Sequence, residues 1–145
     1  MMLTVNEVEV AGRLRPVLLK LARELRREVA DLGVSGGQAT LLATIKAQPG
    51  VSAAALAAQE RMSAAGMSGH IDRLAALGLV RRDVDPADRR RQALRLTAEG
   101  EALLRKVRSR RTAWLASRLG ELPPHELAAV EAALDPLAKL LEVGE

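Results

Sequence analysis

Residues 64–97 have the sequence AAGMSGHIDRLAALGLVRRDVDPADRRRQALRLT, and this stretch decides the fold. Its first part carries apolar residues at helical spacing and is closed by Gly78. Two short alternating runs follow, Leu79–Asp83 and Gln92–Leu96, with a charged turn between them. We therefore predict a helix over residues 63–77, followed by a β-hairpin with a basic tip.

A second short helix precedes this one. Ser52 caps an alanine-rich run, Ala53–Gln59, and Ser63 caps the helix of residues 63–77. Two short helices joined by about three residues have helix-turn-helix spacing. The second helix has one apolar face, formed by Met67, Ile71 and Leu74. We expect that face to pack on the core, which leaves a face of small and polar residues for contact with another surface.

The flanking segments predict long helices. Apolar residues at three- and four-residue spacing indicate a helix over Val5–Asp31, in which Pro16 predicts a kink or a late start. Ser35 begins a capping box and a further helix. Thr97 caps a helix that continues to about Leu119, and Pro123 and the proline after it open the last one, for about six helices in total. The last helix has a regular apolar stripe typical of helix–helix packing: Leu127, Val130, Leu134, Leu137 and Leu141.

Composition bounds the function. The chain has 145 residues, 48% of them hydrophobic, which fits a single domain with a real core. Residues 61–111 hold 13 Arg and Lys against 6 Asp and Glu, a net charge of +7, while residues 112–145 have a net charge of −4. The positive segment favours a polyanionic partner, and a solvated basic face is the equal alternative.

Several function classes are excluded or disfavoured. The absence of cysteine excludes disulfides, thiolate metal sites and thiol redox sensing. His70 and His125 lie far apart in the sequence, so we predict no metal, and no cofactor is indicated. The chain has no phosphate-binding glycine loop and no nucleophile with its base, and its Ser and Thr residues lie at caps, so we do not expect an enzyme. Neither a membrane span nor a signal peptide is evident, and we expect a cytoplasmic protein.

Three segments together resemble the MarR family of winged helix-turn-helix transcriptional regulators: Leu74–Arg82, Asp85–Arg91 and Leu94–Gly100. The resemblance covers essentially the whole chain, and its specific part is an Asp-Arg-Arg wing followed by Leu-Thr-x-x-Gly. It implies a mainly α fold with a small β-hairpin, which combines a winged helix-turn-helix domain with a helical dimerisation lobe.

The resemblance also implies an organisation and a function. Residues 35–97 would form the DNA-binding region, and residues 1–34 and 98–145 would form the dimerisation region of a homodimer, most often a repressor. Residues 63–77 would enter the major groove and a wing of residues 84–91 the flanking minor groove. The operator would be pseudo-palindromic, with half-sites roughly 34–36 Å apart. The alternative is a winged-helix module that binds protein without sequence-specific DNA binding.

The resemblance carries over to individual residues. Arg90 occupies the place of the wing-tip arginine of the family, and Asp72 matches a carboxylate that pairs with that arginine, with a solvated carboxylate as the alternative. Asp88 is expected to organise the wing turn. The candidate DNA-binding residues are Ser63, Ser68, Gly69, Arg73, Arg89, Arg90 and Arg91.

The predicted recognition helix departs from the family pattern. Gly66 and Gly69 stand where members often carry Thr and a long polar residue. We therefore expect specificity to depend more on groove shape and wing contacts than on direct base reading. For His70, burial and DNA contact are equally open.

Many members of the family respond to small aromatic acids. Trp114 and Arg15 are the candidate pocket residues here, with Arg13 and His70 as further polar groups. A tryptophan in such a helix is more often a core or interface residue, and that alternative stays open.

Overall fold

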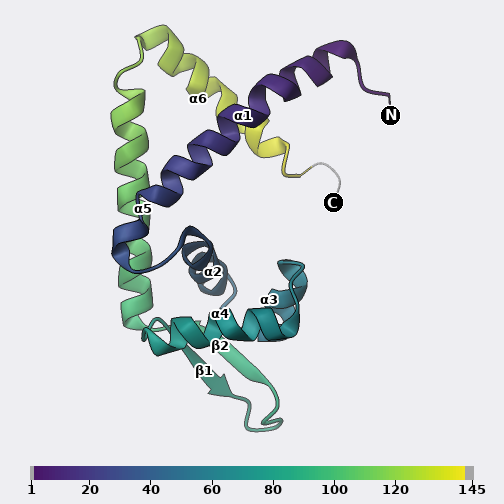
Figure 1. The fold of residues 1–145 in the computed structure, drawn as a ribbon, viewed down its shortest axis with the longest axis vertical. Helices are drawn as coiled ribbons and strands as arrows, with labels where there is room; N and C mark the ends of the chain where they lie inside the picture. Colours follow the sequence, from purple (N-terminus) through teal and green to yellow (C-terminus); the bar gives the residue numbers. More distant parts are fainter. Residues whose placement is uncertain (1, 143–145) are drawn as a thin grey trace. The chain divides into compact units, whose positions relative to one another are not determined.

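The computed structural model describes residues 2–142 and is mainly helical, with one antiparallel hairpin (Figure 1). The described part contains six α-helices, as the sequence predicted. In chain order the elements are α1 (Val5–Arg27), the 3-10 helix η1 (Ala30–Leu32), α2 (Gly36–Ala47), α3 (Ala53–Gln59), α4 (Ala64–Ala76), β1 (Val80–Val84), β2 (Gln92–Leu96), α5 (Ala98–Leu119) and α6 (Pro124–Lys139).

The chain divides into two units within α5. The first unit extends to Arg110 and the second begins at Arg111. The first unit holds α1 to α4, the hairpin and the first half of α5, and the second holds the end of α5 and α6. In residues 2–142 no helix combines the length and the hydropathy needed to cross a membrane.

Two element boundaries differ from the prediction. The first helix ends at Arg27 rather than Asp31, and the chain then tightens into η1. Of the kink or late start predicted from Pro16, the late start does not occur, because Thr4 forms a capping box that begins α1 at Val5. Strand β1 starts one residue after Leu79, whose amide donates to the Leu74 carbonyl and so closes α4 instead of joining the strand ladder.

The winged region, residues 35–97, has its own apolar core between α2, α3, α4 and the hairpin. The predicted inward face of α4 is confirmed: Met67, Ile71 and Leu74 are all buried. Val51 forms an isolated antiparallel β-bridge with Leu94 of β2, in which the Val51 carbonyl accepts from the Leu94 amide at 2.9 Å. The hairpin is thereby held to the connection between α2 and α3.

A second core cluster joins the end of α1 to α2 and α5. Its buried residues are Val29, Ala39 and Val107. Beside it, the Arg110 guanidinium donates to the Asp31 carboxylate at 2.6 Å and to the Glu28 carbonyl at 3.3 Å. The hydrogen bond from Arg110 lowers the pKa of Asp31. This exposed ion pair links α5 to η1 and to Glu28, the residue that follows α1.

The turn after α4 packs tightly against the start of α5. The Thr97 hydroxyl donates to the Gly78 carbonyl at 2.5 Å and accepts from the Gly100 amide at 3.0 Å. The Thr97 amide donates to the Leu79 carbonyl at 3.0 Å. A Cβ added to Gly100 would lie 2.1 Å from that same Leu79 carbonyl oxygen. Only glycine therefore fits at this position of the Leu-Thr-x-x-Gly motif.

We predict that Gly100→Ala lowers the free energy of unfolding by about 1–3 kcal/mol, because backbone must shift to admit the methyl group. Urea denaturation followed by circular dichroism at one protein concentration measures this. Gly69→Ala is the control, because nothing lies within 4 Å of its Cβ position. That variant should gain about 0.5–1 kcal/mol from the better helix propensity of alanine. A Gly100→Ala variant as stable as the parent would contradict the close contact.

Candidate nucleic-acid interface

Helix α4 presents a capped N-terminus and one open face. The Ser63 hydroxyl accepts from the Gly66 amide at 3.0 Å and begins the helix, and Gly78, with φ +76°, follows its end. Opposite the buried face, Ser68, Asp72 and Arg73 are exposed and Gly69 is half-buried. The sequence-predicted polar face of this helix is therefore accessible to a partner.

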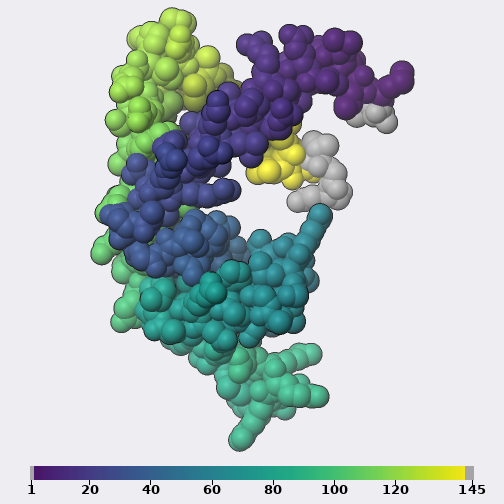
Figure 2. All heavy atoms as spheres, viewed as in Figure 1, coloured from purple at the N-terminus to yellow at the C-terminus, as the bar shows by residue number. Residues whose placement is uncertain are grey.

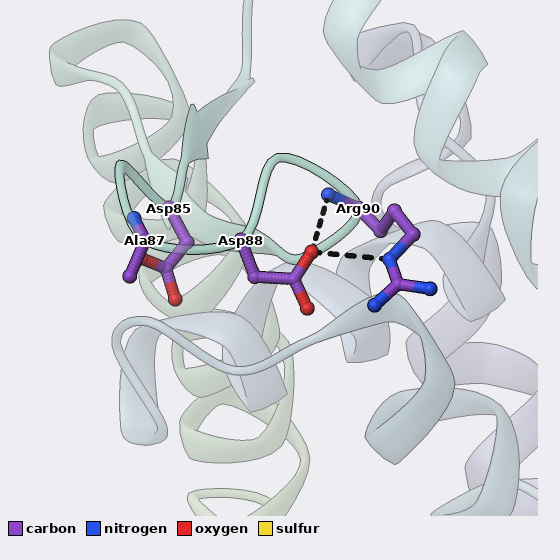
Figure 3. Close-up of polar contacts among 4 residues, drawn as sticks. All are labelled: Asp85, Ala87, Asp88 and Arg90. Carbon is purple, nitrogen blue, oxygen red and sulfur yellow. Dashed lines mark hydrogen bonds and ion pairs between the residues drawn. The ribbon is translucent and has the colours of Figure 1, made fainter.

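The wing, residues 84–91, is a closed turn organised by two aspartates. The Asp85 carboxylate accepts from the Ala87 amide at 2.9 Å. Asp88 accepts from Arg90 twice at one oxygen, from its backbone amide at 3.0 Å and from its Nε at 3.2 Å (Figure 3). The Asp85 amide donates to the Arg91 carbonyl at 3.0 Å and closes the loop. Asp88 thus bonds the backbone and the side chain of Arg90, and its role in orienting the wing stays a prediction.

The wing also extends away from the rest of the winged region, as Figure 2 shows for the side chains at the tip of the hairpin. The Arg90 side chain is 91% exposed, whereas that of Asp88 is 34% exposed. Arg89 and Arg91 are exposed as well. The three arginines therefore form a positively charged tip that solvent or a partner can reach.

The predicted pairing of Asp72 with Arg90 does not form. The Asp72 carboxylate pairs with the guanidinium of Arg82 on β1. Arg90 is occupied by Asp88. The reason is position: Arg82 lies opposite Leu94 in the middle of the hairpin, near the core, while Arg90 lies in the turn. Asp72 still ties α4 to the hairpin, but through the strand rather than through the wing tip.

A further ion-pair group holds the two strands together. Arg81 and Arg95 are cross-strand neighbours, and two like charges directly opposite each other would be destabilising. The Asp83 carboxylate bridges them, 3.3 Å from Arg81 Nε and 3.4 Å from Arg95 Nε. The sequence reasoning did not identify Arg81, Asp83 and Arg95 as a network. The available signal was that Arg81 and Asp83, two residues apart on β1, share one face of the strand.

A cavity of about 520 Å³ lies beside α4 in the first unit. Its wall combines the apolar side chains of Leu41, Met62 and Met67 with six polar ones, namely Arg26, Ser35, Gln38, Thr40, Glu60 and His70. His70 is half-buried on this wall, which decides for neither burial nor DNA contact, the two alternatives that the sequence left open. No three His, Asp or Glu side chains gather around a common ion position in residues 2–142.

The two predicted effector residues are placed elsewhere. Arg15 is exposed on α1 and is not among the residues that line the cavity beside α4. Trp114 is half-buried in the second unit, where the Arg118 guanidinium lies 5.2 Å from the centre of its ring. This is a cation–π contact between residues one turn apart on α5.

Comparison with known proteins identifies the family. A sequence model described as the MarR family matches residues 32–91, which include most of the winged region and its wing. A proposed transcriptional regulator from Pseudomonas aeruginosa has the same fold, with a TM-score of 0.82 and 30% identity over 99% of this chain and 100% of that one. The chain belongs to the MarR family. The resemblance inferred from the sequence is thereby confirmed.

Other members extend this result. An uncharacterised HTH-type transcriptional regulator of Mycobacterium bovis is 29% identical over 137 residues, which cover 94% of this chain and 96% of the relative. A mutant of Staphylococcus aureus MepR, solved bound to an oligodeoxyribonucleotide, shares the fold at 20% identity, with a TM-score of 0.71 over 91% of this chain and 97% of that one. MarR membership makes this chain a DNA-binding transcriptional regulator, a class of binding protein rather than an enzyme class.

The pairing of Asp72 can be tested with double-mutant cycles in this MarR protein. We predict that Asp72→Asn and Arg82→Gln are coupled by about 0.2–1 kcal/mol in the free energy of unfolding, the usual range for an exposed ion pair. Asp72→Asn and Arg90→Gln should be additive. Urea denaturation of the single and double variants measures both couplings. Coupling to Arg90 with none to Arg82 would show that the carboxylate belongs to the wing tip instead.

Proposed function

We propose that the protein is a homodimeric repressor that binds a pseudo-palindromic operator. In each half-site α4 enters the major groove and the wing reaches the flanking minor groove. The observation that carries the proposal is the wing tip: Arg90 extends from a closed turn, held by Asp88, with its guanidinium exposed. It belongs to the same basic segment, residues 61–111, as the open face of α4.

The wing geometry suits a narrow minor groove. Such a groove has enhanced negative potential, and arginine is the side chain that it attracts most. The Asx-type bond from the Arg90 amide to Asp88 fixes the backbone, so little further ordering is needed on binding. The Arg90 side chain exchanges Asp88 for DNA, while Arg89 and Arg91 contact phosphates. A carboxylate as partially buried as Asp88 stays behind as a wing-orienting group.

The surface of α4 supports docking with little direct base reading. Its candidate contacts are Ser63, Ser68, Gly69 and Arg73. Gly69 has no neighbour within 4 Å of its Cβ position, so the helix backbone can approach the edge of the groove closely. Arg73 is the one long cation among these residues and reaches phosphate or base. MepR bound to DNA has the same fold, which supports this arrangement.

The outer helices support a dimer. Neither α1 nor α6 has a buried residue, although both are amphipathic in sequence. Their exposed apolar side chains include Val10, Val17, Leu18, Leu127 and Leu134. Apolar surface of this extent marks an interface. We assign residues 1–34 and 98–145 to dimerisation and residues 35–97 to DNA binding. Two-fold symmetry of the dimer would impose two-fold symmetry on the operator.

We propose that the protein acts in the cytoplasm, where it would meet DNA.

We propose a small aromatic acid as the effector. The cavity beside α4 has the size of a small-molecule site, since such sites measure roughly 300–1,000 Å³. Arg26 and His70 on its wall could hold a carboxylate. Occupancy next to the core face of α4 would change how that helix meets DNA. This cavity is a stronger candidate than a pocket formed by Arg15 and Trp114.

We predict that Arg90→Ala weakens binding to an operator duplex about tenfold and reduces the salt slope of log K by about one. The duplex is obtained by selection from random DNA, and affinity is measured by fluorescence anisotropy at several salt concentrations. Arg105→Ala, which removes an exposed arginine on α5, should change neither quantity. Equal affinity of a folded Arg90→Ala variant would contradict the wing assignment. Absence of salt-dependent DNA binding in the parent would favour the protein-binding alternative.

We predict that the protein has twice its chain mass of 15.5 kDa in solution and that Leu134→Glu shifts it to the monomer. Leu134 is 58% exposed on α6, so the introduced carboxylate would disrupt an interface rather than the core of the protomer. Light scattering after size exclusion measures the mass. Leu77→Glu, at an exposed leucine of the winged region, should remain dimeric. A monomeric parent at micromolar concentration would contradict the dimer.

A further inference from the structure

Sulfur in this chain occurs as thioether alone, because there are four methionines and no cysteine. Met67 is 1% exposed and belongs to the core, while Met62 is 39% exposed and Met2 is 94% exposed. An oxidant in solution therefore reaches Met62 and Met2 but not Met67. Methionine sulfoxide is polar and chiral, so its formation matters where the thioether packs against something.

Met62 packs against the first turn of α4. It lies in the connection between α3 and α4, and its amide donates to the Ala57 carbonyl at 2.9 Å. Its Cγ and Sδ lie 3.3 and 3.6 Å from the position that a Cβ on Gly66 would occupy. The Met62 side chain thus covers the helix at the residue where the family pattern leads one to expect a larger side chain. A Cβ at position 66 would be in tight contact with that side chain.

The same turn holds the N-terminal cap of α4. The Ser63 hydroxyl accepts from the Gly66 amide at 3.0 Å and is itself 3.0 Å from the Gly66 Cβ position. The thioether, the capping hydroxyl and the capped amide therefore meet around Gly66. A change of polarity at the sulfur acts directly on the start of the helix that we propose docks in the major groove.

We propose that Met62 is an oxidation site through which a hydroperoxide weakens DNA binding, an inference that rests on the proposed function of α4. A sulfur lone pair attacks one peroxide oxygen, the S–O bond forms and the O–O bond breaks. The sulfur gives up two electrons, and the peroxide is reduced as its other oxygen leaves as hydroxide from hydrogen peroxide or as alkoxide from an alkyl hydroperoxide. The proton on the transferred oxygen passes to that hydroxide or alkoxide, so the products are the sulfoxide and water or an alcohol.

The sulfoxide changes two contacts. Its oxygen is a strong acceptor and competes with the Ser63 hydroxyl for the Gly66 amide. Its polarity also draws the side chain toward water and uncovers the apolar wall that it shares with Met67 beside α4. Both effects loosen the first turn of α4. The affinity for DNA falls by about fivefold, the change that loss of one helix cap produces in an equilibrium constant.

The test treats the full-length protein with millimolar hydrogen peroxide and measures three quantities. Peptide mass spectrometry should show one added oxygen on Met62 before Met67. Hydrogen exchange of residues 63–67 should accelerate. Anisotropy on the selected duplex should show the loss of affinity, and methionine sulfoxide reductase should restore it. Met62→Leu should keep its affinity through the same treatment, whereas Met2→Leu, the matched control, should lose it as the parent does.

The outcomes separate this proposal from the DNA-binding proposal. Untreated protein that binds no DNA contradicts the proposed function, and the exchange of residues 63–67 then still reports on Met62. Treated protein that carries the Met62 sulfoxide and binds as well as untreated protein overturns the oxidation proposal alone. Equal loss of affinity in Met62→Leu and the parent also overturns it, because the effect then arises at another residue.

Discussion

The winged region depends on one close contact, that of Gly100 with the Leu79 carbonyl. A side chain cannot enter there, because its Cβ would lie 2.1 Å from the carbonyl oxygen. The contact is reinforced by Thr97, which donates to the Gly78 carbonyl and caps α5 at the Gly100 amide. The exit of α4, the beginning of the hairpin and the start of α5 are thereby locked together. The orientation of the wing relative to α4 follows from this junction.

Each aspartate of the ion pairs in and beside the hairpin has a specific arginine partner. Asp72 forms an ion pair with Arg82, Asp83 with Arg81 and Arg95, and Asp88 with Arg90. The ion pairs of Asp72 and Asp83 hold the strands and α4 together, so their arginines are not available to a partner. The excess positive charge is left at the tip, where Arg89 and Arg91 have no carboxylate within 4 Å among the described residues. The wing therefore offers exposed arginines to a polyanion, while five other cations of the basic segment, residues 61–111, lie on α5.

Local rules in the sequence predicted much of this structure, and tertiary contacts explain what they missed. The cap at Ser63, the capping box at Ser35 and the buried face of α4 depend on residues within one or two helical turns, so periodicity and capping patterns were sufficient. The partner of Asp72 depends on hairpin register and on the twist that brings Arg82 to α4. Several arginines were available, and the sequence pattern does not rank them.

The glycines of α4 show the same distinction and bear on specificity. The Met62 side chain lies against Gly66, so a larger, base-contacting side chain at position 66 would have to displace it from the first turn of α4. Gly69 is half-buried, but nothing lies within 4 Å of its Cβ position, so the space that a side chain would occupy is empty. A helix with one covered position and one empty position can approach DNA closely but offers few groups to base edges. In the homodimer that we propose, discrimination between operators would come mainly from the energy of fitting the minor-groove width to the two wings, since that energy depends on sequence without base contacts.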